Sequence, residues 1–213
     1  MAKVQNTLIG RASGSVGGAT FTTWKGVNVL KSKPESVANP RTLAQRSQRN
    51  RLTIMVVVYR ALALIVSIGF KSRAVAKSAY NAFMSSNIVP STTVDEEGNA
   101  TLNFANLKFA LGTMGSIPIT AVNAGAGQTQ CEVEFNLFLN PLGSSQNDDA
   151  YMVAYNVRLN EWIASNGFTR ADGTADANFS GNILAGDTIH TYLFFKSANS
   201  DDVCDSVYST INV

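Results

Sequence analysis

Residues 131–139, CEVEFNLFL, carry an apolar side chain at every second position. Side chains of a β-strand alternate between its two faces, so the apolar positions from Cys131 to Leu139 share one face, and Glu132 and Glu134 share the other. This pattern predicts a strand that buries one face in a sheet.

Further β-prone runs surround this stretch in the C-terminal part of the chain. They cover residues 151–159, 188–196 and 203–213. Turn-forming pairs such as Asn166-Gly167 and Asp172-Gly173 separate the runs. About seven short strands in roughly 120 residues predict an antiparallel β-sandwich of immunoglobulin-like character.

The two cysteines, Cys131 and Cys204, both fall on predicted strands. They form no Cys-x-x-Cys pattern, so the sequence indicates no zinc or redox site. Their predicted positions are also compatible with a disulfide between them. Two buried thiols are the favoured interpretation for a protein made in the cytoplasm.

Helical signals lie before the predicted sheets. Asn39-Pro40 is a helix start, with asparagine as the N-cap and proline at the first helical position. From Leu52 to Ile68 the helix is apolar almost all round, which predicts burial on several sides, and Gly69 is its expected end. A second helix is expected over residues 72–86, which predicts a helical hairpin.

The run Leu52–Ile68 is 17 residues long and is also similar to a short membrane span. A spanning helix needs about 20 apolar residues, and Arg60 near the centre of the run is unfavourable in lipid. A buried helix is therefore the favoured interpretation, and no membrane partner is expected. No secretory signal is expected either, because no apolar run follows Lys3 at the N-terminus.

The first 38 residues are rich in glycine and lysine and are expected to form an arm. Two β-prone runs, residues 19–24 and 27–31, flank Lys25-Gly26 and predict a β-hairpin. The arm is too small for a core of its own, so it has to pack on the rest of the chain or on a neighbour.

The two halves of the chain carry opposite charge, although the net charge of the whole chain is only +2. Residues 1–90 hold 13 Lys/Arg and one acid, Glu35, whereas residues 91–213 hold 4 Lys/Arg and 14 Asp/Glu. Such a split indicates that the halves face different partners, or that the basic half of one copy meets the acidic half of another. Charged residues make up only 15% of the chain, against roughly 25% in typical domains. Burial in an assembly and exposed Ser, Thr and Asn on strands both explain the low value.

Residue types that perform catalysis or bind cofactors are scarce in this chain. His190 is the only histidine and is expected on the surface of a strand, so a metal site can have at most one histidine ligand. The acid pairs Asp148-Asp149 and Asp201-Asp202 lack EF-hand spacing and are expected to be solvated loop tips. The stretch Gly10–Gly18 lacks the Gly-Lys-Ser/Thr ending of a phosphate-binding loop. We therefore expect no enzyme, and no catalytic, cofactor or metal site.

Two other binding functions remain open from the residues alone. The basic half would bind DNA without sequence preference, with Arg46 and Arg49 near one helix face and Trp24 or Phe21 available to stack on a base. No nucleic-acid fold signature supports this alternative. A carbohydrate-binding module would need exposed aromatic side chains, although the cores of sandwiches use the same residue types. The available aromatic residues are Trp162, Tyr151 and Tyr155.

Several short motifs follow one another in the first 90 residues. They are Gly14-Ser15-Val16-Gly17-Gly18, Trp24-Lys25-Gly26, Asn39-Pro40-Arg41-Thr42, Ile68-Gly69-Phe70-Lys71 and Ala79-Tyr80-Asn81-Ala82. In this order they resemble a domain-of-unknown-function family of bacteria and their phages, and the C-terminal half is similar to that family in layout. The occurrence of the family in phage gene sets implies a virion structural role by association and no activity.

These observations lead to one expectation, a non-enzymatic phage virion structural protein that assembles into a ring or other oligomer of the tail, the neck or the capsid. Its expected partners are copies of itself and other virion proteins, with non-specific DNA binding as the alternative. Its expected location is the virion, after synthesis in the host cytoplasm. The expected fold is α+β, with a β-hairpin arm at residues 1–38, a basic helical hairpin at 39–89 and an acidic, immunoglobulin-like β-sandwich at 90–213. The expected partner-binding residues are Trp24, Lys25, Lys31, Lys33, Arg41, Arg46, Arg49 and Arg51.

Overall fold

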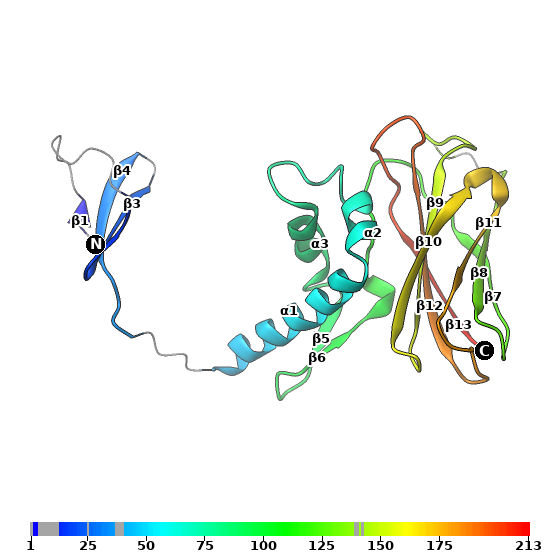
Figure 1. The fold of residues 1–213 in the computed structure, drawn as a ribbon, viewed down its shortest axis with the longest axis horizontal. Coiled ribbons are helices and arrows are strands. Elements are labelled where there is room, and N and C mark those ends of the chain that lie inside the picture. The colour runs from blue at the N-terminus through cyan, green and yellow to red at the C-terminus, as the bar shows by residue number, and fades with distance from the viewer. Residues whose placement is uncertain (1, 4–12, 25, 37–40, 139–140, 142) are drawn as a thin grey trace. The chain divides into compact units, whose positions relative to one another are not determined.

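The computed structural model describes residues 2–3, 13–24, 26–36, 41–138, 141 and 143–213, and at residues 2, 3 and 24 it describes the backbone only. The chain divides into two compact units, Met1–Thr42 and Leu43–Val213, here called the N-terminal unit and the C-terminal unit (Figure 1). The expected helix start Asn39-Pro40 and the predicted partner residue Lys25 lie outside the described residues.

The strands described in the N-terminal unit form one antiparallel sheet in the order β1-β4-β3-β2. The strands are β1 (Ala2–Lys3), β2 (Gly14–Val16), β3 (Ala19–Trp24) and β4 (Val27–Ser32). Trp24 pairs with Val27 across the turn, which confirms the predicted hairpin. Among the described side chains of this unit only Val29 is buried. The described part of the sheet therefore encloses no core of its own.

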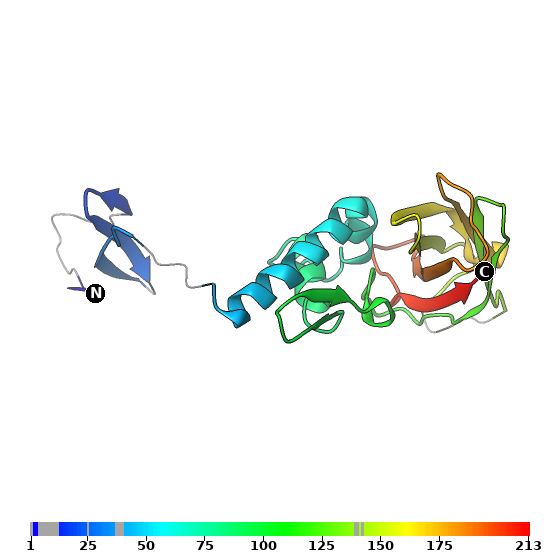
Figure 2. The same cartoon turned by 90° about the horizontal axis from the view of Figure 1, so that it is seen from below.

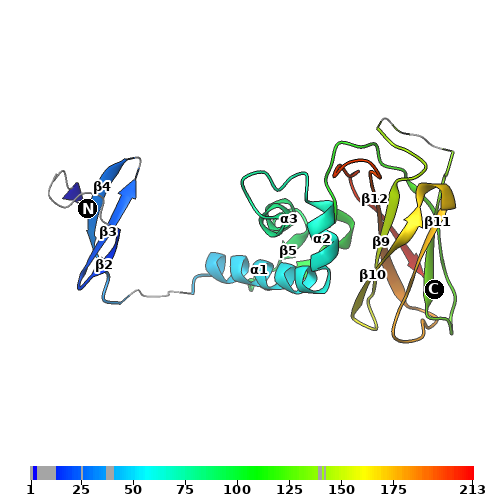
Figure 3. The same cartoon turned by 45° about the horizontal axis from the view of Figure 1, so that its top comes forward.

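Three α-helices open the described part of the C-terminal unit. They are α1 (Leu43–Ala61), α2 (Ala63–Gly69) and α3 (Ala79–Asn87). The prediction of one continuous helix up to Gly69 is wrong, because the chain bends by 92° between α1 and α2 (Figure 3). Leu62 at the bend is buried, and the bend brings Ile65 and Val66 of α2 into the core.

No single helix in the described ranges is long and apolar enough to cross a membrane. The helices α1 and α2 meet the length and composition of a span only when taken together, as a pair bent at Leu62.

The apolar run Leu52–Ile68, which was predicted to be buried on several sides, is buried only in part. Met55 and Val58 are buried, whereas Val57 is 58% exposed and Leu64 is 81% exposed. The two helices therefore present apolar side chains to solvent as well as to the core.

The second predicted helix begins at Ala79 instead of Ser72. Ser78 is its N-cap, and the Ser78 hydroxyl accepts a hydrogen bond from the backbone N–H of Asn81 at 3.2 Å. This bond satisfies one of the donors that the first turn of a helix leaves without a partner. Phe83 of α3 then packs edge-on against Phe70, with ring centroids 5.7 Å apart.

The rest of the C-terminal unit is antiparallel β-structure. The hairpin of β5 (Thr92–Val94) and β6 (Ala100–Leu102) comes first, followed by the 3-10 helix η1 (Phe104–Asn106). A four-stranded sheet has the order β10-β9-β12-β13, and a three-stranded sheet has the order β11-β8-β7. The α+β class is confirmed.

The two sheets contain seven strands in the described part of the chain. They are β7 (Ile119–Ala124), β8 (Gln130–Phe135), β9 (Asp149–Asn156), β10 (Glu161–Thr169), β11 (Thr174–Asn178), β12 (Thr188–Lys196) and β13 (Val207–Asn212). The 3-10 helix η2 (Arg170–Asp172) lies between β10 and β11. Figure 2 shows the yellow β10 and the red β13 at opposite edges of the four-stranded sheet.

The alternation at residues 131–139 is confirmed as far as Phe135. Cys131, Val133 and Phe135 are buried, whereas β8 ends at Phe135 and Phe138 is 84% exposed. The run from Ala150 to Ala154 on β9 is instead buried on both faces; β9 is an inner strand between β10 and β12, and it also contacts β11 of the other sheet.

One core joins the two sheets and the helices. Phe135 of β8 meets Phe195 of β12, with ring centroids 5.1 Å apart. Phe109 meets Tyr192 of β12 at 4.8 Å and Phe83 of α3 at 6.2 Å. Phe109 therefore links the helices to the four-stranded sheet.

The segment around Phe109 is hydrogen-bonded to distant parts of the chain on both sides. The N–H of Leu111 donates to the carbonyl of Gly69 at the end of α2, at 3.1 Å. The N–H of Ser206 donates to the carbonyl of Ala110, also at 3.1 Å.

Two glycines permit these close approaches. A Cβ at Gly69 would lie 2.1 Å from the carbonyl oxygen of Phe109, and a Cβ at Gly112 would lie 1.7 Å from the carbonyl oxygen of Val203. Real Cβ atoms essentially never come so close to a backbone oxygen. The helices and the C-terminal segment can therefore meet the Phe109 segment only where there is no side chain.

Asp148 is not a solvated loop tip, contrary to the prediction. Its side chain is 1% exposed, and its carboxylate lies 3.5 Å from Nη2 of Arg170, which is fully buried. The guanidinium of Arg170 also lies over the ring of Phe195, 4.3 Å from the centroid. Asp201 does lie at the surface, where it pairs with exposed Lys71 at 2.8 Å.

Replacement of Gly69 by alanine is expected to lower the free energy of unfolding, at the upper end of the ~1–3 kcal/mol typical of overpacking, because the new Cβ would meet a backbone oxygen. Gly181→Ala is the matched control, since its Cβ would meet only the side chain of Leu159, at 3.1 Å. Urea unfolding compares the two variants, and equal stabilities would contradict the role given to Gly69.

Asp148→Asn is expected to destabilise the C-terminal unit by about 3–5 kcal/mol, because the charge of Arg170 would stay buried without a counter-ion. Adding Arg170→Met should recover much of this loss, since the double variant buries no charge. Chemical denaturation of both variants measures the difference. A double variant less stable than Asp148→Asn would show that the two charges are not coupled in this way.

Candidate functional site

The eight predicted partner-binding residues divide between the two units. Lys31 lies in β4, and both it and Lys33 are exposed. The backbone N–H of Lys33 donates to the carbonyl of Gly18 at 2.7 Å, so the chain stays paired beyond the end of β4. Trp24 is the last residue of β3, and Lys25 lies outside the described residues.

The four predicted arginines lie around the start of α1. Arg41 precedes the helix and has a positive φ of 48°. Arg46 and Arg49 are exposed, and Arg51 is half-buried. Nη1 of Arg46 donates a hydrogen bond to the carbonyl of Glu97 at 3.2 Å, which brings the basic start of the helix to the loop between β5 and β6.

This loop, Asp95–Asn99, is here called the acidic turn. The carboxylate of Asp95 accepts hydrogen bonds from the side chain and the backbone N–H of Asn99, and these bonds lower the pKa of Asp95. Nδ2 of Asn50 on α1 donates to the carbonyl of Gly98 at 2.8 Å. The basic start of α1 is therefore held against an acidic segment of the same unit. The sequence analysis did not predict this contact, which joins residues 51 positions apart.

The outward side chains of the three-stranded sheet form a second surface, here called the outer face. It consists of Asn123 on β7, Gln130, Glu132 and Glu134 on β8, and Thr174, Asp176 and Asn178 on β11. The residues that alternate with them along β8 and β11, such as Val133 and Ala175, are buried. Alternation along the strands therefore places the outer face on the side away from the core.

The outer face is negatively charged. Asp176 stands directly opposite Glu132, and Glu134 follows two residues further along β8. Nδ2 of Asn123 donates to Glu134 at 2.5 Å, and Nδ2 of Asn178 donates to Asp176 at 3.5 Å. No ion pair within the described ranges involves any of these three carboxylates. Like charges directly opposite one another destabilise an antiparallel pair, so this face would gain from a cationic partner.

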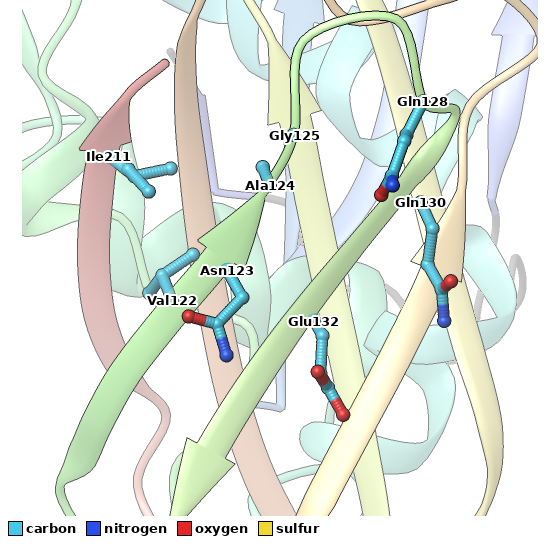
Figure 4. A pocket seen from close by; sticks show the side chains of 8 residues that line it. All are labelled: Val122, Asn123, Ala124, Gly125, Gln128, Gln130, Glu132 and Ile211. Carbon is cyan, nitrogen blue, oxygen red and sulfur yellow. The ribbon is translucent and has the colours of Figure 1, made fainter.

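A hollow of about 360 Å³ lies beside the outer face, at the end of β7 and the start of β8 (Figure 4). Its polar lining residues are Asn123, Gln128, Gln130 and Glu132. Val122 of β7 and Ile211 of β13 add an apolar side to it. The hollow offers amide groups and a single carboxylate, which suit hydrogen bonding to a partner but provide no acid–base pair.

Another hollow, of about 560 Å³, lies where α1 and α2 approach β9 and β10. Leu64 lines it and is largely exposed, and Tyr151 and Trp162 line its other side. Among the described residues of its lining, Arg60 is the only basic one. These residues are mainly apolar and include no cluster of catalytic groups.

The aromatic residues considered for carbohydrate binding pack against other rings. Tyr155 and Trp162 stack with centroids 4.4 Å apart, and Phe104 stacks on Tyr155 at 5.2 Å. Tyr151 is 8% exposed and stacks on Phe194 at 5.1 Å. The rings therefore serve the core and its edge, and carbohydrate binding gains no support from their arrangement.

His190 lies at the edge of this aromatic cluster. It stacks on Phe104 at 4.0 Å, and its Nδ1 is 2.9 Å from the hydroxyl of Tyr208. The residue is half-buried instead of freely exposed, and burial lowers its pKa below the ordinary value. No carboxylate is hydrogen-bonded to it within the described part of the chain, so the geometry shows no catalytic pair.

Neither cysteine forms a disulfide, which confirms the interpretation as two buried thiols. Burial raises the pKa of Cys131 to about 12 and that of Cys204 to about 11, so both thiols are protonated at neutral pH. Within the described ranges no group of three His, Cys, Asp or Glu side chains could hold a metal ion.

Comparison with known proteins identifies a family for this chain but indicates no activity. A family model described as a family of unknown function (DUF6266) matches residues 11–210. No curated protein matches the chain.

His190 is expected to titrate below the ordinary histidine pKa of about 6.5, because its place between Phe104 and Tyr208 disfavours the charged ring. The unfolded chain then takes up the proton at a higher pH than the folded chain. Neutral His190 therefore makes its full contribution to the free energy of unfolding when the pH is above the pKa of His190 in the unfolded chain. This contribution is lost as the pH falls through the pKa of His190 in the folded chain.

An NMR titration of this single histidine measures its pKa directly. Denaturation of a His190→Gln variant between pH 7 and pH 5 should show a weaker dependence on pH than the parent protein. A histidine pKa at or above the ordinary value would contradict the expectation.

Proposed function

The chain belongs to the DUF6266 family of unknown function, and from that premise we propose that it is a non-enzymatic virion structural protein that assembles into a ring or other oligomer. It docks through its basic N-terminal unit and the basic start of α1. Its partners are copies of itself and other virion proteins, and its place is the virion after synthesis in the host cytoplasm. No cofactor or membrane takes part.

The observation that best supports this proposal is the missing core of the N-terminal unit. Val29 is the only buried side chain among those described there, while Phe21 and Leu30 are half-buried and Val16 is 72% exposed. A small sheet is stable in water only when it has a hydrophobic face to bury or another element to pack against. The unit therefore needs a partner surface, as a docking arm would.

Exposed apolar side chains on the helices also support assembly. Val57 and Leu64 are largely exposed, and Leu64 borders the hollow at the bend between α1 and α2. Large exposed apolar surface usually marks a site of contact with another molecule. In an assembled particle a neighbouring subunit would cover it.

We also propose that the two C-terminal sheets form an immunoglobulin-like β-sandwich. Both sheets are antiparallel, and Phe135 of one sheet contacts Phe195 of the other. Sandwiches bury such inward-facing residues between two antiparallel sheets. This part of the subunit would be its rigid outward module.

The virion setting rests on the resemblance of the first 90 residues to a family that occurs in phage gene sets. Non-specific nucleic-acid binding is the alternative. The contact between Arg46 and the carbonyl of Glu97 argues against it, because the acidic turn beside the helix repels phosphate.

The native mass of the nuclease-treated protein, measured by light scattering at low and high salt, tests the proposal. The wild-type protein should form a defined oligomer that weakens with salt. Lys31→Glu/Lys33→Glu should reduce the mass to that of a monomer. Lys77→Glu/Lys108→Glu, at two exposed lysines of the C-terminal unit, is the control with the same change in charge and should assemble as the wild type does.

A wild-type protein that stays monomeric at all concentrations would contradict the proposal. A mass that falls only on nuclease treatment, together with DNA binding that Arg46→Glu/Arg49→Glu abolishes, would establish the alternative instead.

A further inference from the structure

We propose that the outer face of the three-stranded sheet is the surface that receives the N-terminal unit of a second copy of this chain. This inference rests on the proposed assembly function and identifies the acceptor for its docking arm. The outer face and the arm fit each other in charge, in hydrogen-bonding groups and in spacing.

The outer face has negative charge that nothing described in its own unit neutralises. Glu132 and Asp176 face each other directly across β8 and β11, and Glu134 lies in the next row on the same face. The groups that contact these carboxylates, Asn123 and Asn178, are neutral amides. Bringing a cation between the strands would therefore relieve a repulsion that the isolated unit keeps.

The N-terminal unit supplies the opposite charge. Residues 1–42 contain six Lys/Arg and one acid, Glu35. A lysine ammonium group has three hydrogen-bond donors and no acceptor, whereas a face of carboxylate and amide side chains is rich in acceptor oxygens. The donors of the arm therefore match the acceptors of the outer face.

The spacing of the charges also matches. Lys31 and Lys33 are two residues apart on a chain that pairs in register with β3, and both are exposed. Glu132 and Glu134 are two residues apart on β8. Alternate residues along a strand lie about 6.6 Å apart. A strand that carries Lys31 and Lys33 and lies alongside β8 therefore brings each lysine close to one of the two glutamates. The hollow beside Glu132 leaves room for a long side chain at this place (Figure 4).

The length of the linker supports an arm that comes from another copy. Nine residues separate Lys33 from Leu43 at the start of α1, and the ten Cα–Cα steps between them span at most about 35 Å when fully extended. The 19 residues of α1 already extend about 28 Å. Figures 1 and 2 show that α1 runs from its start toward the sheets, and that the three-stranded sheet lies beyond the four-stranded one.

The path from the start of α1 to the outer face therefore includes the length of α1, the four-stranded sheet and the separation between two packed sheets. That separation is about 10 Å. This path is longer than the extended linker, which supports assigning the docked arm to another copy. Such a contact joins the arm of one copy to the outer face of another. The pair therefore still has one free arm and one free outer face. Repeated contacts of this kind close into a ring or extend as a filament.

Charge reversal in separate copies tests this inference with the full-length chain. One variant is Lys31→Glu/Lys33→Glu, and the other is Glu132→Lys/Glu134→Lys. The second should fold, because it places a cation opposite Asp176. Each variant alone should be monomeric by light scattering, and an equimolar mixture should associate again, since the charges of the two variants are complementary. Glu96→Lys/Glu97→Lys, at two exposed glutamates of the acidic turn, is the matched control and should assemble alone.

The possible results separate this inference from the proposed function. If the wild type assembles and Glu132→Lys/Glu134→Lys assembles equally well, the acceptor lies elsewhere and only this inference is overturned. If the two monomeric variants fail to associate when mixed, the pairing of the two surfaces is likewise overturned, while assembly itself stands. A monomeric wild type overturns both.

Discussion

The C-terminal unit depends on the close contact of its Phe109–Gly112 segment with α2 on one side and with the Val203–Ser206 segment on the other. Both contacts place backbone against backbone, and both need glycine at the point of approach. Hydrogen bonds from Leu111 and Ser206 then fix the segment in register. Because Phe109 packs on rings of α3 and of β12, the same contact determines how the helices lie on the sheet.

The parts of the fold that sequence could predict are those whose cause is local. β8 alternates because one face meets the core and the other meets solvent, and Cys131, Val133 and Phe135 show this directly. The hairpin of β3 and β4 follows from two β-prone runs around a turn. The bend at Leu62 has no such signal, since its neighbours Ala61 and Ala63 favour a helix. Its cause is tertiary, because the bend buries Leu62, Ile65 and Val66.

The same distinction explains the candidate site. Glu132 and Glu134 could be placed on one strand face from alternation alone. Asp176 could not, because its strand, TADAN, has weak β-propensity and is identified mainly by its pairing with β8. Asp148 was expected in solvent since its counter-ion, Arg170, is distant in sequence. The contact of Arg46 with Glu97 likewise spans 51 residues, and no local pattern announces it.

The long sequence separation of the Phe109 contacts has a consequence for the order of events on the ribosome. The N-terminal hairpin needs only residues within its own unit and can pair as soon as they leave the exit tunnel. The hydrogen bond between Phe109 and Ser206 joins residues 97 positions apart, so this contact cannot form until synthesis has passed Ser206. A nascent chain therefore carries a paired basic hairpin before its C-terminal unit is complete.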